Sequence, residues 1–338
     1  MIFFHLPGVV LGTRKAHGTR EFIALLGSTA AIWVRAARAD KLRRIVILHS
    51  GFPRRTPIDH LFDALRERGY EDGRTAKIEL LGGEGDPDRL KALIAGVVSE
   101  KPDVTIAVTS PAALGLKQAG LTTPVVFAFV SDPVGQGIVA SLAHPEGNFT
   151  GISYSETKIG SKRLEFLLGA VPTARRTAVI WGSGFPENAA MATAVEAAAQ
   201  ARGLPALSRK VIQLNDLALA FEDAAKFGAT ALIFLTDNLL FGHRKEVAEL
   251  ALSHHLPSIH SFPPEVQDGA LMSYGPDVEE EYQRAAALAD RILKGVPPAD
   301  LPVEEPTRFN LVINIKTAKA FGLSVPPTLL ALADKVIE

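Results

Sequence analysis

The chain contains no cysteine among its 338 residues. Disulfide bridges, thiolate metal sites and cysteine nucleophiles are therefore excluded. An exported lipoprotein also needs a cysteine just after its apolar signal core, because the lipid is attached there. Without that residue, we expect any exported form of this chain to be released as a soluble protein.

An excess of charge of either sign is also missing, since the formal net charge is −1. Residues 1–39 hold five basic side chains and one acidic one, so the remainder carries 31 Lys and Arg against 36 Asp and Glu, a net charge near −5. A mildly acidic chain lacks the electrostatic basis for binding nucleic acid or an anionic membrane. We therefore expect neither as a partner.

Long apolar stretches are rare, and the most distinct one lies near the N-terminus. Residues 22–34 carry no charge, follow the basic residues Arg14, Lys15 and Arg20, and precede a small-x-small site at 37–39. This order is typical of a secretory signal peptide, and the core is shorter than the roughly 20 residues that span a bilayer. An ordinary buried helix is the alternative. We expect cleavage after Ala39 and, because a soluble exported protein is retained only behind an outer membrane, a Gram-negative periplasm.

Beyond residue 40, short β-branched runs alternate with helical patterns. Strands are predicted at 44–48, 77–80, 104–108 and 125–130, with helices at 58–68, 87–99 and 112–119. After a crossing segment at 148–153, a second series has strands at 178–181, 207–212, 231–235 and 258–260 and helices at 188–202, 217–227 and 244–254. Apolar strands separated by helices indicate parallel sheets covered on both faces. The sequence therefore predicts an α/β protein with two doubly wound units.

The remaining residues add a helix at 278–294, a strand at 309–314, a short helix at 317–321 and a final helix from Thr328. We expect this part of the chain to return across both units. Residues 40–152 with 273–301 are then predicted to form one lobe, and residues 153–272 with 302–338 the other.

Polar residues follow one strand in each unit. Ligands of open parallel sheets lie beyond the carboxyl ends of the strands, where helix N-termini present free N–H groups. Thr109 and Ser110 stand at such an end in the first unit, and Thr236 and Asp237 stand at one in the second. A ligand is therefore expected in a cleft between the two units.

Several multi-residue segments stand out along the chain. They are Ser-Asp-Pro-Val-Gly-Gln-Gly at 131–137, the segment 141–151, Leu-Met-Ser-Tyr-Gly at 271–275, Ile-Leu-Lys-Gly at 292–295 with 301–304, and the terminal segments 312–323, 326–327 and 333–338. Together and in this order, they resemble the ABC-transporter substrate-binding family that includes the tryptophan-type binding proteins. The resemblance implies a type I periplasmic binding fold: two Rossmann-like lobes, a hinge of three segments, and closure over a small molecule.

The first unit, with the segment that follows its strand at 125–130, contributes five candidate ligand-binding residues. Ser50 and Gly51 follow the first strand and offer a cradle of N–H groups. Ser110 begins a helix, where a serine is by default an N-cap, although a ligand carboxylate would use the same hydroxyl. Asp132 precedes a proline, which alone indicates a turn, but a ligand ammonium would need such a carboxylate. Ser131 is its neighbour in the same motif.

The second unit contributes four more candidates. Asp237 begins a helix, whose N-terminus favours any acid by a few tenths of a kcal/mol, so a structural role is the alternative to ligand binding. Phe262 and Tyr274 lie at a strand end and a crossing, and Trp181 ends the first strand of this unit. Aromatic rings in such places are core residues more often than ligand walls.

Catalysis is not expected, and neither is a cofactor. The nine histidines are scattered, and the pair at 254–255 has no spaced third ligand for a metal. A racemase-like two-lobed enzyme would need paired cysteines. The resemblance therefore implies a monomeric receptor that delivers an aromatic amino acid, or a related aromatic or carboxylate compound, to an ABC permease of the inner membrane. A ligand-sensing module for a membrane receptor or kinase is the alternative.

Overall fold

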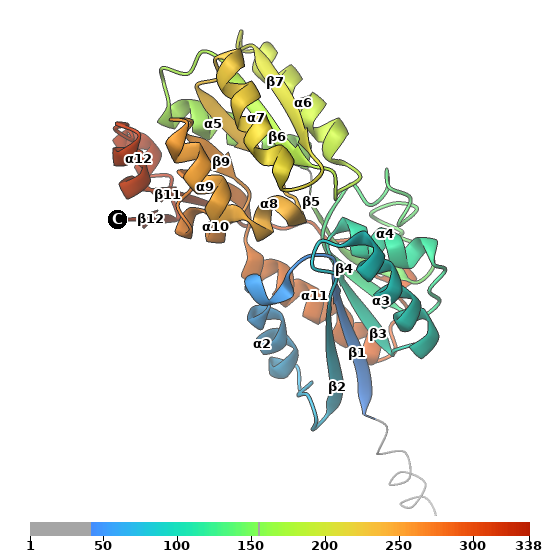
Figure 1. Cartoon of the computed structure of the whole chain (residues 1–338). Coiled ribbons are helices and arrows are strands. Elements are labelled where there is room, and N and C mark those ends of the chain that lie inside the picture. Colours follow the sequence, from blue (N-terminus) through green and yellow to red (C-terminus); the bar gives the residue numbers. More distant parts are fainter. Residues whose placement is uncertain (1–41, 155) are drawn as a thin grey trace, which may run out of the picture. The chain divides into compact units, whose positions relative to one another are not determined.

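The computed structural model describes residues 42–154 and 156–338 (Figure 1). The predicted signal peptide lies outside the described residues, so cleavage after Ala39 stays a prediction. Within the described ranges, no helix combines the length and the apolar character needed to cross a membrane.

The first sheet has five parallel strands in the order β2-β1-β3-β4-β5. They are β1 (Arg43–His49), β2 (Ala76–Gly82), β3 (Val104–Val108), β4 (Val125–Ser131) and β5 (Phe149–Tyr154), with helices α2 (Asp59–Glu67), α3 (Pro87–Glu100) and α4 (Ser110–Gln118) and a 3-10 turn at Pro53–Arg55. Every residue of β3 and β4 is buried. Helices therefore cover both faces of this sheet, as the apolar strand sequences predict. We call this sheet and its helices the first lobe.

The second sheet has seven strands in the order β12-β11-β10-β9-β8-β6-β7, and only β10 and β11 pair antiparallel. Its strands are β6 (Thr177–Gly182), β7 (Ala206–Val211), β8 (Ala231–Phe234), β9 (Ser258–His260), β10 (Met272–Pro276), β11 (Phe309–Asn314) and β12 (Lys335–Ile337). Its helices are α5 (Glu156–Ala170), α6 (Asn188–Gln200), α7 (Asn215–Phe227), α8 (Asn238–Gly242), α9 (Arg244–Ser253), α10 (Pro263–Gln267), α12 (Ile315–Ala320) and α13 (Pro327–Leu330). We call these elements the second lobe.

The chain passes between the lobes three times. It leaves the first lobe after β5, returns to it with α11 (Val278–Leu293), and leaves it again after a 3-10 turn at Pro298–Asp300. Helix α11 lies beside α2 in Figure 1, and its buried face shares one core with β1 and β3. Because β10 pairs in the second sheet, the return begins after Pro276 and not at residue 273 as expected.

The last residues differ from the predicted final helix. Helix α13 has only four residues, and β12 then pairs with β11. The side chain of Asp334 accepts a hydrogen bond of 2.7 Å from the Leu311 amide, while the Asp334 amide donates to the Leu311 carbonyl oxygen. These two bonds hold the chain at the edge of the sheet, so the segment continues as a strand.

Glu281 on α11 is an acid buried in the first lobe, with 0% of its surface exposed. One of its oxygens, Oε2, accepts a long hydrogen bond of 3.4 Å from the amide of Phe129. Burial raises the pKa of Glu281 to about 8; the Phe129 amide opposes this shift, Glu280 adds to it, and Arg284 opposes it. At neutral pH the carboxyl group therefore keeps its proton.

Replacing Glu281 with glutamine is expected to stabilise the protein, and more strongly at pH 8 than at pH 5. The unfolded chain releases the proton near pH 4.5, whereas the folded chain holds it up to about pH 8. Between these values, stability therefore falls as pH rises. The gain at pH 8 should be on the order of 2 kcal/mol, or roughly 4 °C in Tm.

Thermal unfolding at both pH values measures this gain. The matched control is Glu279→Gln, which makes the same change at an exposed position of α11. An equal change in Tm at both pH values would show that Glu281 does not carry the proton.

Candidate functional site

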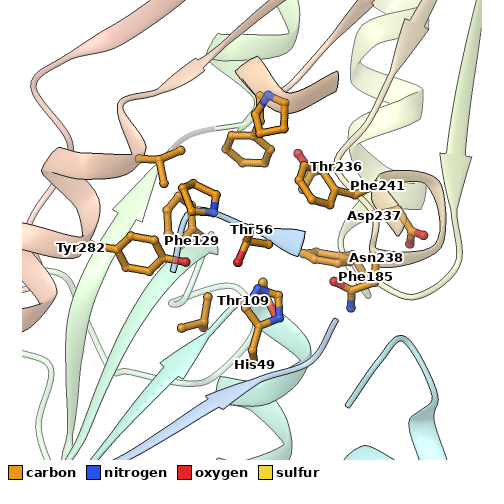
Figure 2. Close-up of a pocket in the computed structure, with 15 residues that line it drawn as sticks. His49, Thr56, Thr109, Phe129, Phe185, Thr236, Asp237, Asn238, Phe241 and Tyr282 are labelled. Carbon is orange, nitrogen blue, oxygen red and sulfur yellow. The ribbon is translucent and has the colours of Figure 1, made fainter. Parts of the chain in front are cut away.

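One cavity lies where strands from both sheets end (Figure 2). Both lobes contribute to its lining, which consists of His49, Thr56, Pro57, Val108, Thr109, Phe129, Phe185, Thr236, Asp237, Asn238, Phe241, Phe262, Pro264, Val278 and Tyr282.

Aromatic rings from four different elements form one part of the lining. The ring of Phe129 meets Phe262 edge-to-face at 5.9 Å between centroids and Tyr282 at 5.2 Å. Phe241 on α8 meets Phe262 in the same way at 6.3 Å. These contacts connect β4 and α11 with the segments around α8 and α10. The resulting surface matches a flat apolar ring, which aromatic side chains contact through both faces and edges.

Phe129 occupies its place because the backbone there is unusual. Its φ of +56° lies in the left-handed region, and the pairing of β4 with β5 is irregular between Phe127 and Val130. A bulge of this kind redirects a side chain that regular strand alternation would place elsewhere. The bond from the Phe129 amide to Glu281 lies at the same point.

Polar groups from both lobes gather in another part of the site. The hydroxyl oxygens of Ser50 and Thr109 lie 2.5 Å apart, and Asn238 Nδ2 donates to Ser50 Oγ at 2.7 Å. Asn238 belongs to the second lobe, so this bond joins the lobes. A side chain at Gly51 would place its Cβ 2.4 Å from Asn238 Oδ1, so only glycine permits this approach.

His49 ends β1 beside these groups and is 5% exposed. Its Nδ1 accepts a hydrogen bond of 2.8 Å from the Gly51 amide. Burial lowers the pKa of His49 to about 4, so the ring is neutral at physiological pH. A neutral ring whose Nδ1 accepts a bond carries its proton on Nε2, and we assign this tautomer from the hydrogen bond.

Asp237 is the acid among the described residues that line the cavity. It is 2% exposed and caps α8: Oδ1 accepts from the Leu239 and Leu240 amides, at 2.8 and 3.4 Å, and Oδ2 accepts from Gly184 at 3.0 Å. Burial raises the pKa of Asp237, and the three backbone donors oppose that shift. Oδ2 keeps room for a further donor, because a carboxylate offers about four acceptor positions. The described lining contains no Lys or Arg.

Ser110 and Ser131 meet the second lobe. Both hydroxyls donate to Glu187 Oε1, at 2.7 and 2.9 Å. Glu187 precedes α6 and does not cap it through its side chain. The two serines that the sequence analysis assigns to a ligand are therefore engaged by a carboxylate of the chain itself.

The other predicted residues divide into two groups. Asp237 and Phe262 line the cavity. Ser50 and Gly51 do not line it, but both contact the lining residue Asn238. Asp132, Trp181 and Tyr274 do not line it. Asp132 is exposed and accepts the Gly135 amide within its own turn at 2.9 Å.

Trp181 packs against the core of the second lobe, and its indole donates to Ser208 at 2.8 Å. Tyr274 packs against the cores of both lobes, and its ring contacts Phe166 and Phe309. Both rings therefore make the kind of packing contact that the sequence analysis gave as the alternative to ligand binding.

Six lining residues with aromatic, imidazole or amide side chains were not among the predicted site residues: His49, Phe129, Phe185, Asn238, Phe241 and Tyr282. A sequence signal exists for His49 and Asn238, because each adjoins a predicted site residue at a strand end. The aromatic residues carry no such signal. In the described part of the chain, no group of three or more His, Asp or Glu could hold a metal ion.

Replacing Glu187 with alanine should loosen the contact between the lobes. It removes the oxygen that accepts from both serine hydroxyls, and a hydrogen bond is worth about 0.5–1.5 kcal/mol, or about 1.5–3 kcal/mol where one partner is charged. We expect amide hydrogen exchange at residues 109–113 and 185–190 to accelerate by at least about tenfold.

Hydrogen exchange followed by mass spectrometry measures this effect. Glu196→Ala, on helix α6, is the control and should leave both segments unchanged. Ser131→Ala, which removes one of the two bonds, should give a smaller effect at the same segments. Unchanged exchange in Glu187→Ala would contradict the bridging role.

Known proteins resemble this chain along most of its length. A solved ABC domain in complex with L-Trp from Streptococcus pneumonia is 26% identical, with a TM-score of 0.81 over 88% of this chain and 100% of that one. A conserved domain protein from Vibrio cholerae is 24% identical, with a TM-score of 0.82 over the same shares, and supports the fold alone. The type I periplasmic binding fold with two lobes, expected from the resemblance, is thereby confirmed.

A tyrosine-binding protein of Clostridioides difficile (strain R20291) is 27% identical over 261 residues, which are 77% of this chain and 74% of that protein. The family model described as ABC transporter substrate binding protein matches residues 46–337. That family consists of solute-binding proteins and not of enzymes, as expected. On this match, the chain belongs to the ABC transporter substrate binding protein family.

Proposed function

We propose that this protein is the periplasmic receptor of an ABC importer and that its cavity binds an aromatic amino acid. The observation that carries the proposal is the cavity lining, which combines aromatic rings, uncharged hydrogen-bonding groups and one buried carboxylate. The ligand's ring would contact the aromatic part. Its ammonium and carboxylate groups would meet the polar part.

Charge favours a zwitterion over a simple aromatic acid. Asp237 supplies a carboxylate to the cavity, and the described lining supplies no cation. An aromatic acid without an amine would add a second negative charge to a desolvated space, which is unfavourable. The ammonium group of an amino acid balances Asp237, so the loaded site gains no net charge.

The number of polar groups disfavours a sugar. A sugar presents hydroxyl groups around its ring, and each buried hydroxyl needs a partner. In this cavity, Phe129, Phe241, Phe262 and Tyr282 occupy much of the lining. The tyrosine-binding relative and the L-Trp complex support the same class of ligand.

Delivery to a permease is the role that membership of the family supports. Export with cleavage after Ala39, a monomeric state and an inner-membrane ABC permease as partner belong to this proposal. A sensing role for a membrane receptor or kinase has no observation in its favour here.

Isothermal titration of the chain from residue 40 onward with L-tryptophan, L-tyrosine and L-phenylalanine tests the proposal. At least one should bind, and at 100 times its Kd it should stabilise the fold by about 2.7 kcal/mol in thermal unfolding. Benzoate and glucose serve as controls and should not bind. Binding of either control in place of the amino acids would contradict the proposed ligand class.

Replacing Asp237 with asparagine should weaken amino-acid binding by at least about tenfold, because the ammonium loses its charged partner. Asparagine is a good N-cap, so α8 should remain intact, but its amide nitrogen cannot accept from Gly184, so the unliganded protein should lose about 1–3 kcal/mol of stability. The matched control is Asp132→Asn, which makes the same change at an exposed position. The sequence-based assignment of Asp132 to the ligand predicts a loss there as well, whereas the structure predicts none.

A further inference from the structure

We propose that His49 determines ligand specificity by donating its Nε2–H to the carboxylate of the bound amino acid. This inference rests on the proposed function and names the residue that distinguishes an amino acid from the corresponding amine.

The first argument is the hydrogen bonding of the ring. Nδ1 is occupied by the Gly51 amide, so Nε2 carries the proton of the ring. The residue is 5% exposed and lines the cavity, and Nε2 is not among the solvent-excluded polar atoms that lack a partner. A ligand that fills the cavity would remove water from this donor, so it must supply an acceptor in return.

The second argument is that the donors beside His49 are neutral and held in place. Asn238 Nδ2 donates one N–H to Ser50, and one of the two hydroxyls of Ser50 and Thr109 donates to the other. These bonds fix the loop after β1 beside the His49 ring. Because the described lining has no Lys or Arg, a ligand carboxylate must be met by neutral donors of this kind.

The third argument is the charge state of the ring. Burial lowers the pKa of His49 to about 4, so it acts as a neutral donor across the physiological range. A neutral donor bonds to a carboxylate through a charge-assisted hydrogen bond without adding a second ion to the cavity. The ammonium and Asp237 then remain the compensating pair.

A mutant cycle on both protein and ligand tests the inference. The variants are His49→Phe, which keeps a ring but removes both nitrogens, and His49→Gln, which keeps an acceptor and a donor. The matched control is His144→Phe, the same substitution at an exposed position. The ligands are L-tryptophan and L-tyrosine, each with its decarboxylated analogue, tryptamine or tyramine.

We expect His49→Phe to weaken amino-acid binding by at least about tenfold, the effect of one charge-assisted hydrogen bond. The amine should bind the wild type more weakly than the amino acid does. Its affinity should change by less than about twofold in His49→Phe, because the amine has no carboxylate that could bond to His49. His49→Gln should recover most of the affinity, and His144→Phe should match the wild type. An equal loss for amino acid and amine, or no loss for either, would overturn the inference.

Nitrogen-15 NMR of the histidine side chains gives a second readout without altering the site, with His49→Gln used to assign the signal. The free protein should show His49 protonated on Nε2, and the amino acid should shift that proton whereas the amine should not. A ring protonated on Nδ1, or an unperturbed signal in the complex, would overturn the inference. If the wild type binds none of L-tryptophan, L-tyrosine and L-phenylalanine, the proposed function itself fails, whereas binding that is indifferent to His49 contradicts this inference alone.

Discussion

The left-handed backbone at Phe129 is the constraint on which the cavity depends. A non-glycine residue at a φ of +56° costs on the order of 1 kcal/mol or more, so the surrounding structure must hold it there. The Phe129 ring is held between Tyr282 and Phe262, and its amide meets the buried Glu281. The irregular backbone of β4, which belongs to the first lobe, thereby places the Phe129 ring against Tyr282 of α11 and against Phe262 of the second lobe.

Neutral side chains dominate the buried part of the site. His49 has lost its charge through burial, and Glu281 behind the aromatic wall keeps its proton at neutral pH. Asp237 is the one carboxylate in the described lining, where three backbone amides support it. A cavity of this kind favours a zwitterionic ligand, which carries one positive and one negative charge. Burying an unpaired charge would raise the free energy of the complex.

The sequence predicted the strand ends better than the side-chain directions. Runs such as 104–108 and 258–260 match their strands to the residue. The ends of the strands predicted at 231–235 and 258–260 lead to Asp237 and Phe262, which line the cavity. Asp132 also stands at a predicted strand end, but it does not line the cavity. Its own left-handed φ of +46° and its bond to Gly135 turn it into an exposed loop.

The missed residues depend on tertiary structure. No local pattern reveals that Phe129 leaves the regular strand conformation, or that Tyr282 on α11 returns to the first lobe from far along the chain. Helices α8 and α10 have five residues each, too few for a helical period to be recognised. Ser110 and Ser131 occupy the predicted strand ends, but only the fold brings Glu187 to them.

The central claim is that the cavity selects a zwitterion with an aromatic ring. Mass spectrometry of the small molecule released when the natively purified protein is denatured tests it most directly, because the protein itself then chooses among all cellular solutes. The account predicts an aromatic amino acid in molar proportion to the protein. A sugar, or an aromatic acid that lacks an amino group, would contradict it.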